Sequence, residues 1–171
     1  MRTYARLLLA TALTLVLTAG VTTITALPAS SATWAPQKSK SFDPQRDLDQ
    51  FEARILIRVN RARARHNLPK VRVFQTCVDT YAERWSQKLK RSGDLVHRDL
   101  GSVLNGCDLN WVGENLVSGT GLRPWRAVRA WLDSPGHRAV LLKRRAVWAG
   151  VGVRVGNDGR TYAVLNFGDR G

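Results

Sequence analysis

The chain has 171 residues and a formal net charge of +14 at pH 7, from 27 Lys and Arg against 13 Asp and Glu. Hydrophobic residues make up 44% and charged residues 23%, a globular composition that excludes a disordered or collagen-like chain. Two cysteines are too few for a disulfide-dense miniprotein or a four-thiolate zinc module, so the length predicts one domain with its own core.

The N-terminal segment differs from the rest in composition. A basic start is followed by a run rich in Leu, Ala, Thr and Val that reaches about Leu27, and then by the small residues Ser30 and Ala32. This order predicts a secretory signal peptide over residues 1–32, with an uncleaved membrane anchor as the alternative. Residues 33–46 are predicted to be a flexible lead-in, and residues 47–171 to be the folded domain. Removing the signal takes away two arginines and no acid, which leaves a charge of +12.

Export bears on the two cysteines, Cys77 and Cys107. They lie 30 residues apart and are the only two in the chain, and an extracellular compartment permits disulfides. We expect them to be bonded, with a free thiol pair as the alternative. By loop entropy such a bond stabilises the fold by roughly 3 to 4 kcal/mol.

Two long helices are predicted in the first half of the domain. Apolar residues recur at helical spacing from Asp47 to about Asn67, and a second amphipathic stretch runs from Thr76 to Gly93 with Asp79 in its first turn. A basic stripe accompanies each apolar stripe. These stripes consist of Arg54, Arg58, Arg61 and Arg65 in the first helix and Arg84, Lys88 and Arg91 in the second.

The second half is predicted to be more irregular. Residues 93–123 contain six glycines and are expected to be mostly loops. Pro124 begins a short helix, and Ser134 is expected to cap another that has Pro135 at its first position. Alternating valines up to Val155, a turn at residues 156–159 and a return strand to Phe167 predict a closing β-hairpin.

Three residues of this half carry potential chemistry. His97 follows the second helix, His137 lies in the first turn of the short helix, and Glu114 stands in the apolar run WVGENLV. An unpaired buried carboxylate is costly, so Glu114 is expected to have a partner.

Together these motifs resemble the CAP superfamily of cysteine-rich secretory, antigen 5 and pathogenesis-related class 1 proteins, also called the SCP domain. The resemblance rests on VNRAR in the first helix, His97, the tripeptide GEN, the segment WLDSPGHR and the closing strands, and it covers about residues 48–168. The chain is most similar to the short bacterial secreted branch. The resemblance implies an α+β fold, an α-β-α sandwich with a small three-stranded antiparallel sheet. It also implies a cleft in which two His and two acids meet, but the position of the second acid holds Ser134 here.

The resemblance therefore assigns His97, Glu114 and His137 as catalytic or ligand-binding residues, with Asn115, Ser134 and Trp111 lining the cleft. It also implies a possible divalent metal, zinc, between His97 and His137. A simpler interpretation remains open, in which Glu114 and the His pair form a polar network that only pins the loops.

We interpret the chain as a secreted, monomeric CAP/SCP protein that acts at the bacterial cell envelope and binds a wall or lipid component in the cleft. The alternative is a hydrolase of peptidoglycan or peptide bonds that uses Glu114 with His97 and His137, metal-assisted or not. A third class is a purely structural secreted factor. The positive charge favours anionic envelope surfaces, and export argues against a specific nucleic-acid partner. Each basic stripe has the alternative of a merely solvated face.

Overall fold

The computed structural model describes residues 48–73 and 76–169, so the predicted signal peptide and lead-in lie outside the described residues. The helices are α1 (Leu48–Arg65), α2 (Thr76–Ser92), α3 (Gly101–Gly106), α4 (Pro124–Asp133) and α5 (Pro135–Leu141). The strands are β1 (Arg72–Val73), β2 (Trp111–Thr120), β3 (Trp148–Val155) and β4 (Arg160–Asp169). Both long helices and the closing β3–β4 hairpin confirm the predicted elements.

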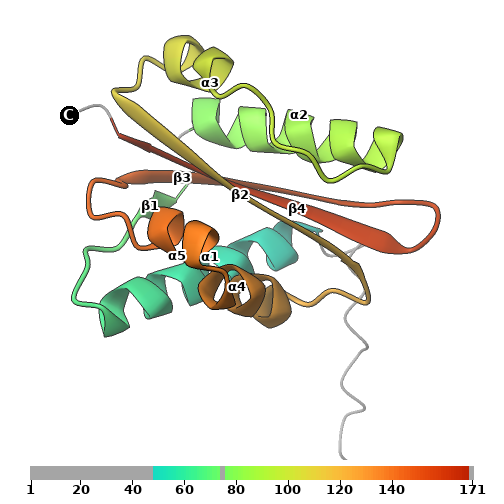
Figure 1. Ribbon diagram of the computed structural model, residues 1–171, viewed down its shortest axis with the longest axis horizontal. Helices are drawn as coiled ribbons and strands as arrows, with labels where there is room; N and C mark the ends of the chain where they lie inside the picture. Colours follow the sequence, from blue (N-terminus) through green and yellow to red (C-terminus); the bar gives the residue numbers. More distant parts are fainter. Residues whose placement is uncertain (1–47, 74–75, 170–171) are drawn as a thin grey trace, which may run out of the picture. The chain divides into compact units, whose positions relative to one another are not determined.

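The strands form one sheet in the order β1-β3-β4-β2. The three long strands are antiparallel, and the two-residue β1 adds to β3 in parallel. Helices α2 and α3 lie on one face of the sheet, and α1, α4 and α5 lie on the other (Figure 1). The α-β-α sandwich is therefore confirmed, with β1 as a short addition to the expected three strands.

The segment 93–123 differs from its prediction. It was expected to be mostly loops, but it contains α3 and the ten-residue strand β2. Two glycines, Gly113 and Gly119, weaken the strand signal in the sequence because glycine has low strand propensity. Pairing along all ten residues with β4 supplies the main-chain hydrogen bonds that the local sequence does not favour.

The core fills both sides of the sheet. Phe51, Ile55 and Val59 of α1 are fully buried, as their spacing predicts, and pack in one cluster with Trp131 of α4. On the other face α2 approaches β3 closely. A Cβ atom at Gly150 or at Gly152 would lie 2.4 Å from backbone atoms of α2, so these positions require glycine.

A disulfide bond joins Cys77, in the first turn of α2, to Cys107, directly after α3. The predicted pairing is confirmed. The bond holds the short helix α3 against α2, where the two cysteines pack with Val78 and Val103.

One arginine of α1 is buried, which the sequence analysis did not foresee. Arg63 is fully inaccessible to solvent and continues the buried stripe of Leu56 and Val59 rather than the exposed basic stripe. Its guanidinium donates four hydrogen bonds of 2.9 to 3.2 Å, and the acceptors are the main-chain carbonyls of Pro69, Leu141, Lys143 and Ala146. Arg63 therefore ties α1 to the loop that precedes β1 and to the connection between α5 and β3.

Asn60 makes a second tie from the same helix to the segment before β1. Asn60 accepts a hydrogen bond from the Val71 N–H at 2.8 Å and donates one to the Val71 carbonyl at 3.1 Å. Its neighbour Arg61, a member of the basic stripe, is exposed.

Two carboxylates, those of the buried Glu52 and the half-buried Asp79, close the edge of the sheet at β3. Beyond its pairing with β1, this strand has outward N–H groups at Val151 and Val153. Asp79 of α2 accepts the first at 3.0 Å and Glu52 of α1 accepts the second at 2.9 Å. Burial, reinforced by a hydrogen bond with Glu83, raises the pKa of Glu52 to about 9.

Candidate functional site

Glu114 lies on β2, the strand at the opposite edge of the sheet, and its side chain is fully buried. Two residues of the segment after α2 contact its carboxylate. His97 Nδ1 is 2.9 Å from Oε1, and Arg98 Nε is 3.0 Å from Oε2. The predicted partner of Glu114 is therefore a His and an Arg together.

Arg98 is the residue of this site that sequence reasoning missed. Its side chain is 8% exposed, and its Nη1 donates a 2.8 Å hydrogen bond to the Tyr81 carbonyl. The guanidinium lies over the rings of Tyr81 and Trp85, at 5.8 and 5.3 Å from their centroids. The only signal in the sequence was its place directly after His97.

The contact between Arg98 and Glu114 is an ion pair rather than a well-aligned hydrogen bond, because Nε and Oε2 are close without the geometry of a hydrogen bond. Burial lowers the pKa of Arg98, and the charge of Glu114 partly opposes that shift. The pair thus places two opposite charges in a poorly solvated position, where each needs the other.

His137 approaches the same edge from the other face of the sheet. Adjacent strand residues point to opposite faces, so Asn115 faces α5 while Glu114 faces α2. The Asn115 amide donates to the His137 carbonyl at 3.1 Å. The rings of His97 and His137 are 6.2 Å apart between centroids, with an interplanar angle of 38°. Together His97, Arg98, Glu114, Asn115 and His137 are named here the histidine site.

Gly113 sets the distance between β2 and the helix that carries His137. A Cβ atom there would lie 2.7 Å from Val140 and 2.9 Å from the Trp111 ring. Glycine therefore allows α5 to pack against the strand next to Glu114. Burial, and secondly the proximity of His97, lowers the pKa of His137, which keeps its imidazole neutral at pH 7.

The remaining predicted cleft residues have different surroundings. Trp111 is partly buried and packs against the main core cluster. Ser134 is half-buried and occupies the N-cap position of α5 as expected, but its side chain makes no capping hydrogen bond. Asp133, the neighbour of Ser134, pairs with Arg129 on the exposed side of α4. The cleft-lining roles of Trp111 and Ser134 stay predictions.

The predicted zinc can be tested against the side chains that would bind it. Catalytic zinc sites usually have three protein ligands, and both carboxylate oxygens of Glu114 are already in contact with His97 and Arg98. Within residues 48–73 and 76–169, no group of three or more His, Cys, Asp or Glu is arranged to hold a metal. The residues therefore do not fit a zinc held by two His and Glu114, and a metal between the two His alone stays a prediction.

The geometry gives Glu114 a positioning role. It fixes His97 through Nδ1, while the His97 side chain remains 55% exposed. The other ring nitrogen, Nε2, has no partner within the described part of the chain and is available to a ligand. The site can therefore offer two neighbouring imidazoles to a polar group.

Comparison with known proteins gives a family and several solved structures. The model of the cysteine-rich secretory protein family, CAP, matches residues 56–167. An outer surface protein of Borrelia burgdorferi is 22% identical with a TM-score of 0.63, over 76% of this chain and 97% of that one. An extracellular protein of Bacillus anthracis that contains an SCP domain is 26% identical with a TM-score of 0.61, over 71% of this chain but 41% of that one.

A more distant structure is that of NaASP2 with Zn²⁺, which is 13% identical with a TM-score of 0.54 and shares 70% of this chain and 80% of its own. This likeness shows a shared fold. Comparison with curated protein sequences gave no match.

Proposed function

Because the chain belongs to the cysteine-rich secretory protein (CAP) family, we propose that it is a secreted protein that binds a wall or lipid component of the bacterial cell envelope at its histidine site. The N-terminal sequence supports export, and the relatives from Borrelia and Bacillus are described as outer-surface and extracellular proteins. Over the described residues, no helix is long and apolar enough to cross a bilayer.

One observation carries the proposal: a buried Glu114–Arg98 ion pair holds an imidazole that is itself more than half exposed. A buried ion pair contributes little net stability compared with apolar packing, so its use here is better explained by the position it gives His97. The neighbouring His137 is neutral and can donate or accept a hydrogen bond.

The surroundings of His97 suit a ligand with both polar and apolar parts. Leu95 and Val96, directly before it, are 43% and 52% exposed and are two of the four large hydrophobic residues exposed in the described structure. Hydroxyls or amides of a wall glycopeptide, or the polar end of a lipid, would meet the imidazoles while carbon atoms contact these side chains.

The contacts and the burial of the Glu114 carboxylate favour binding over hydrolysis. A general base must reach the proton it abstracts, and both oxygens of this carboxylate are in contact with other side chains and shielded from solvent. The hydrolase alternative therefore requires Glu114 to exchange its partners during the reaction.

The test compares co-sedimentation of the mature domain with purified cell walls and with lipid vesicles. The variant His97→Ala/His137→Ala should bind about tenfold more weakly, since it loses two ligand hydrogen bonds. His66→Ala is the matched control, because His66 is the third histidine, is exposed and lies just beyond α1. Equal binding by the site variant and the control would contradict the proposal.

Mass spectrometry of the supernatant decides between the two functions. Wall fragments released by the wild type but not by Glu114→Gln would assign hydrolysis. Retention on walls or vesicles without fragments supports binding alone, and the retaining material identifies the class of ligand.

A further inference from the structure

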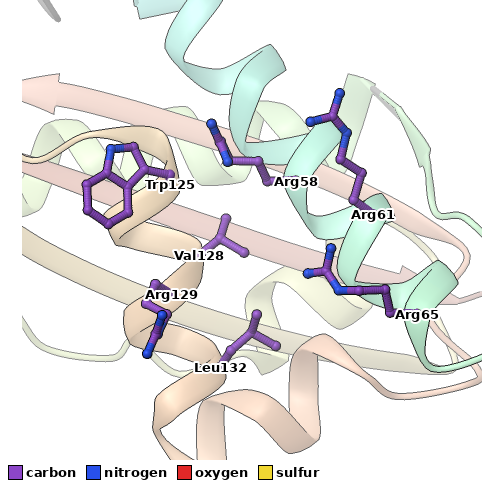
Figure 2. A pocket seen from close by; sticks show the side chains of 7 residues that line it. All are labelled: Arg58, Arg61, Arg65, Trp125, Val128, Arg129 and Leu132. Carbon is purple, nitrogen blue, oxygen red and sulfur yellow. The ribbon is translucent and has the colours of Figure 1, made fainter.

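We propose that the protein has a second binding site, between α1 and α4, for a linear phosphodiester polymer. A pocket of about 250 Å³ opens between these helices (Figure 2). We call it the arginine pocket, and its lining residues are Arg58, Arg61, Arg65, Trp125, Val128, Arg129 and Leu132. It includes no residue of the histidine site, and the proposal does not rest on that site.

Three cations of α1 give the pocket its charge. Arg58, Arg61 and Arg65 are exposed and follow one another at i, i+3 and i+7 along one side of the helix. Figure 2 shows Arg58 and Arg65 extending from α1 toward α4. Like charges three and four residues apart repel each other, so a bound anion would relieve a strain present in the free protein.

These three charges are uncompensated within the described part of the chain, where no carboxylate pairs with them. The fourth arginine of the pocket behaves differently. Arg129 donates through Nε to both oxygens of Asp133, at 2.9 and 3.2 Å. The positive charges of the pocket that have no carboxylate partner therefore lie on α1, and α4 forms the opposite wall of the pocket.

The wall on α4 has an aromatic ring at its rim. Trp125 is 49% exposed, and the guanidinium of Arg126 lies 5.2 Å from the centroid of its ring. Val128 and Leu132 point from α4 into the space between the helices (Figure 2). An exposed indole beside arginines suits a ligand whose carbon atoms stack on the ring while its anionic groups meet the guanidinium groups.

The linear arrangement favours a polymer over a single anion. Seven residues of helix separate Arg58 from Arg65, a rise of about 10 Å, which is longer than one phosphate group. Along the helix axis, Arg61 lies about 4.5 Å beyond Arg58, and Arg65 lies about 6 Å beyond Arg61. The three positive charges are therefore spaced along a line, as the negative charges of a phosphodiester chain are. Arginine is also the side chain that matches phosphate geometry best, since its planar fork donates two hydrogen bonds at once.

A membrane surface is disfavoured as the occupant. Lipid binding by a helix face needs apolar side chains that project into the acyl region beside the basic ones. Here Val128 is only 4% exposed, and Trp125 is the one exposed apolar side chain that lines the pocket, which is a small apolar area for insertion into a bilayer. The predicted mature domain carries a charge of +12, which raises the local concentration of any envelope polyanion.

The test is a titration with purified poly(glycerol phosphate), read by calorimetry and by tryptophan fluorescence at two salt concentrations. The variant Arg58→Gln/Arg61→Gln/Arg65→Gln should bind at least about tenfold more weakly and show a salt slope smaller by about 2, because three phosphate contacts are lost. The matched control, Arg84→Gln/Lys88→Gln/Arg91→Gln, removes the same charge from exposed positions of α2 and should lose less than about threefold.

Three further arms make each outcome decisive. Inorganic phosphate should bind far more weakly than the polymer, and Trp125→Phe should reduce the fluorescence change. Equal losses in the two triple variants would overturn the proposal in favour of nonspecific charge attraction. If the triple variant of α1 lost binding to phosphatidylglycerol vesicles but kept its affinity for the polymer, the proposal would be overturned in favour of a membrane surface. His97→Ala should keep full polymer affinity, which separates this test from that of the proposed function.

Discussion

Each edge of the sheet carries a buried carboxylate, Glu52 at β3 and Glu114 at β2, but the carboxylates at the two edges contact different groups. At β3, Asp79 and Glu52 accept main-chain N–H groups of the strand itself. At β2, Glu114 contacts only side chains, those of His97 and Arg98. A buried acid by itself therefore does not mark a functional site, and the nature of its partners is the more informative observation.

The physical difference between the two edges is whether the carboxylate contacts a side chain that reaches solvent. The carboxylates at the β3 edge replace the strand that β1 is too short to provide, and they contact strand N–H groups and, for Glu52, also the side chain of Glu83. The contacts of Glu114 end in an imidazole that reaches solvent and faces a second one. We infer that the β3 edge serves stability and that the β2 edge serves stability and binding together.

The largest expected effect is on the β2 edge. Glu114→Ala leaves the buried guanidinium of Arg98 without its counter-charge and should lower the free energy of unfolding by about 3 kcal/mol. Asp133→Ala breaks an exposed pair with Arg129 and should cost less than about 0.5 kcal/mol. Urea denaturation of both variants measures the difference. Equal costs would show that Arg98 is solvated and that its pair with Glu114 contributes no more than an exposed ion pair.

At the β3 edge the loss of one hydrogen bond should cost less. Asp79→Ala leaves the Val151 N–H without its acceptor, at a cost of about 1 to 2 kcal/mol, whereas Asp79→Asn retains an acceptor and should cost about half of that or less. Denaturation curves and the amide exchange rate at Val151 provide the measurement. An Asn variant as unstable as the Ala variant would mean that charge, not hydrogen bonding, closes this edge.

Glu52 makes the β3 edge sensitive to pH. Its pKa of about 9 means that the folded protein retains a proton that the unfolded chain releases above about pH 4.5, the ordinary value. Its contribution to stability therefore falls as the pH rises from about 4.5 to 9. Glu52→Gln keeps an acceptor for Val153, should change stability near pH 5 by less than about 1 kcal/mol, and should flatten this slope.

Denaturation at three pH values across that range measures the slope for the wild type and for the variant. Parallel slopes would show that Glu52 is ionised in the folded state and that its burial is incomplete.

The smallest expected effect concerns His137. Because burial and His97 lower its pKa, the unfolded chain takes up a proton there before the folded protein does, so its contribution to stability is lost as the pH falls below about 6.5. NMR titration of the ring protons should give a midpoint below that value, and His97→Ala should move it upward. A midpoint at or above 6.5 would mean that burial does not lower the pKa of His137, and a midpoint unchanged by His97→Ala would mean that the two imidazoles are not electrostatically coupled.

Much of this architecture could be predicted from the sequence, because its signals are local. The apolar spacing of α1 and α2, the turn at residues 156–159 and the proline at the start of α4 each involve neighbouring residues only. The disulfide followed from there being a single possible pair. The family resemblance added His97, Glu114 and His137, and the structure brings these three together.

What local patterns missed depended on contacts distant in the chain. Strand β2 forms because β4 pairs with it, although its glycines weaken any local strand signal. Arg98 differs from other arginines only through Glu114, sixteen residues away, and the rings of α2.

Helix α1 shows the division between sequence and tertiary structure within one element. Its sequence by itself determined that Arg58, Arg61 and Arg65 share a side of the helix, because the helical repeat fixes their angular positions. Only the tertiary structure decided that Arg63, two residues from Arg61 and Arg65, is buried, because four carbonyl oxygens from other segments replace the water around its guanidinium. Charge and periodicity are properties of the chain, but the free energy of burying a charge depends on the partners that folding brings to it.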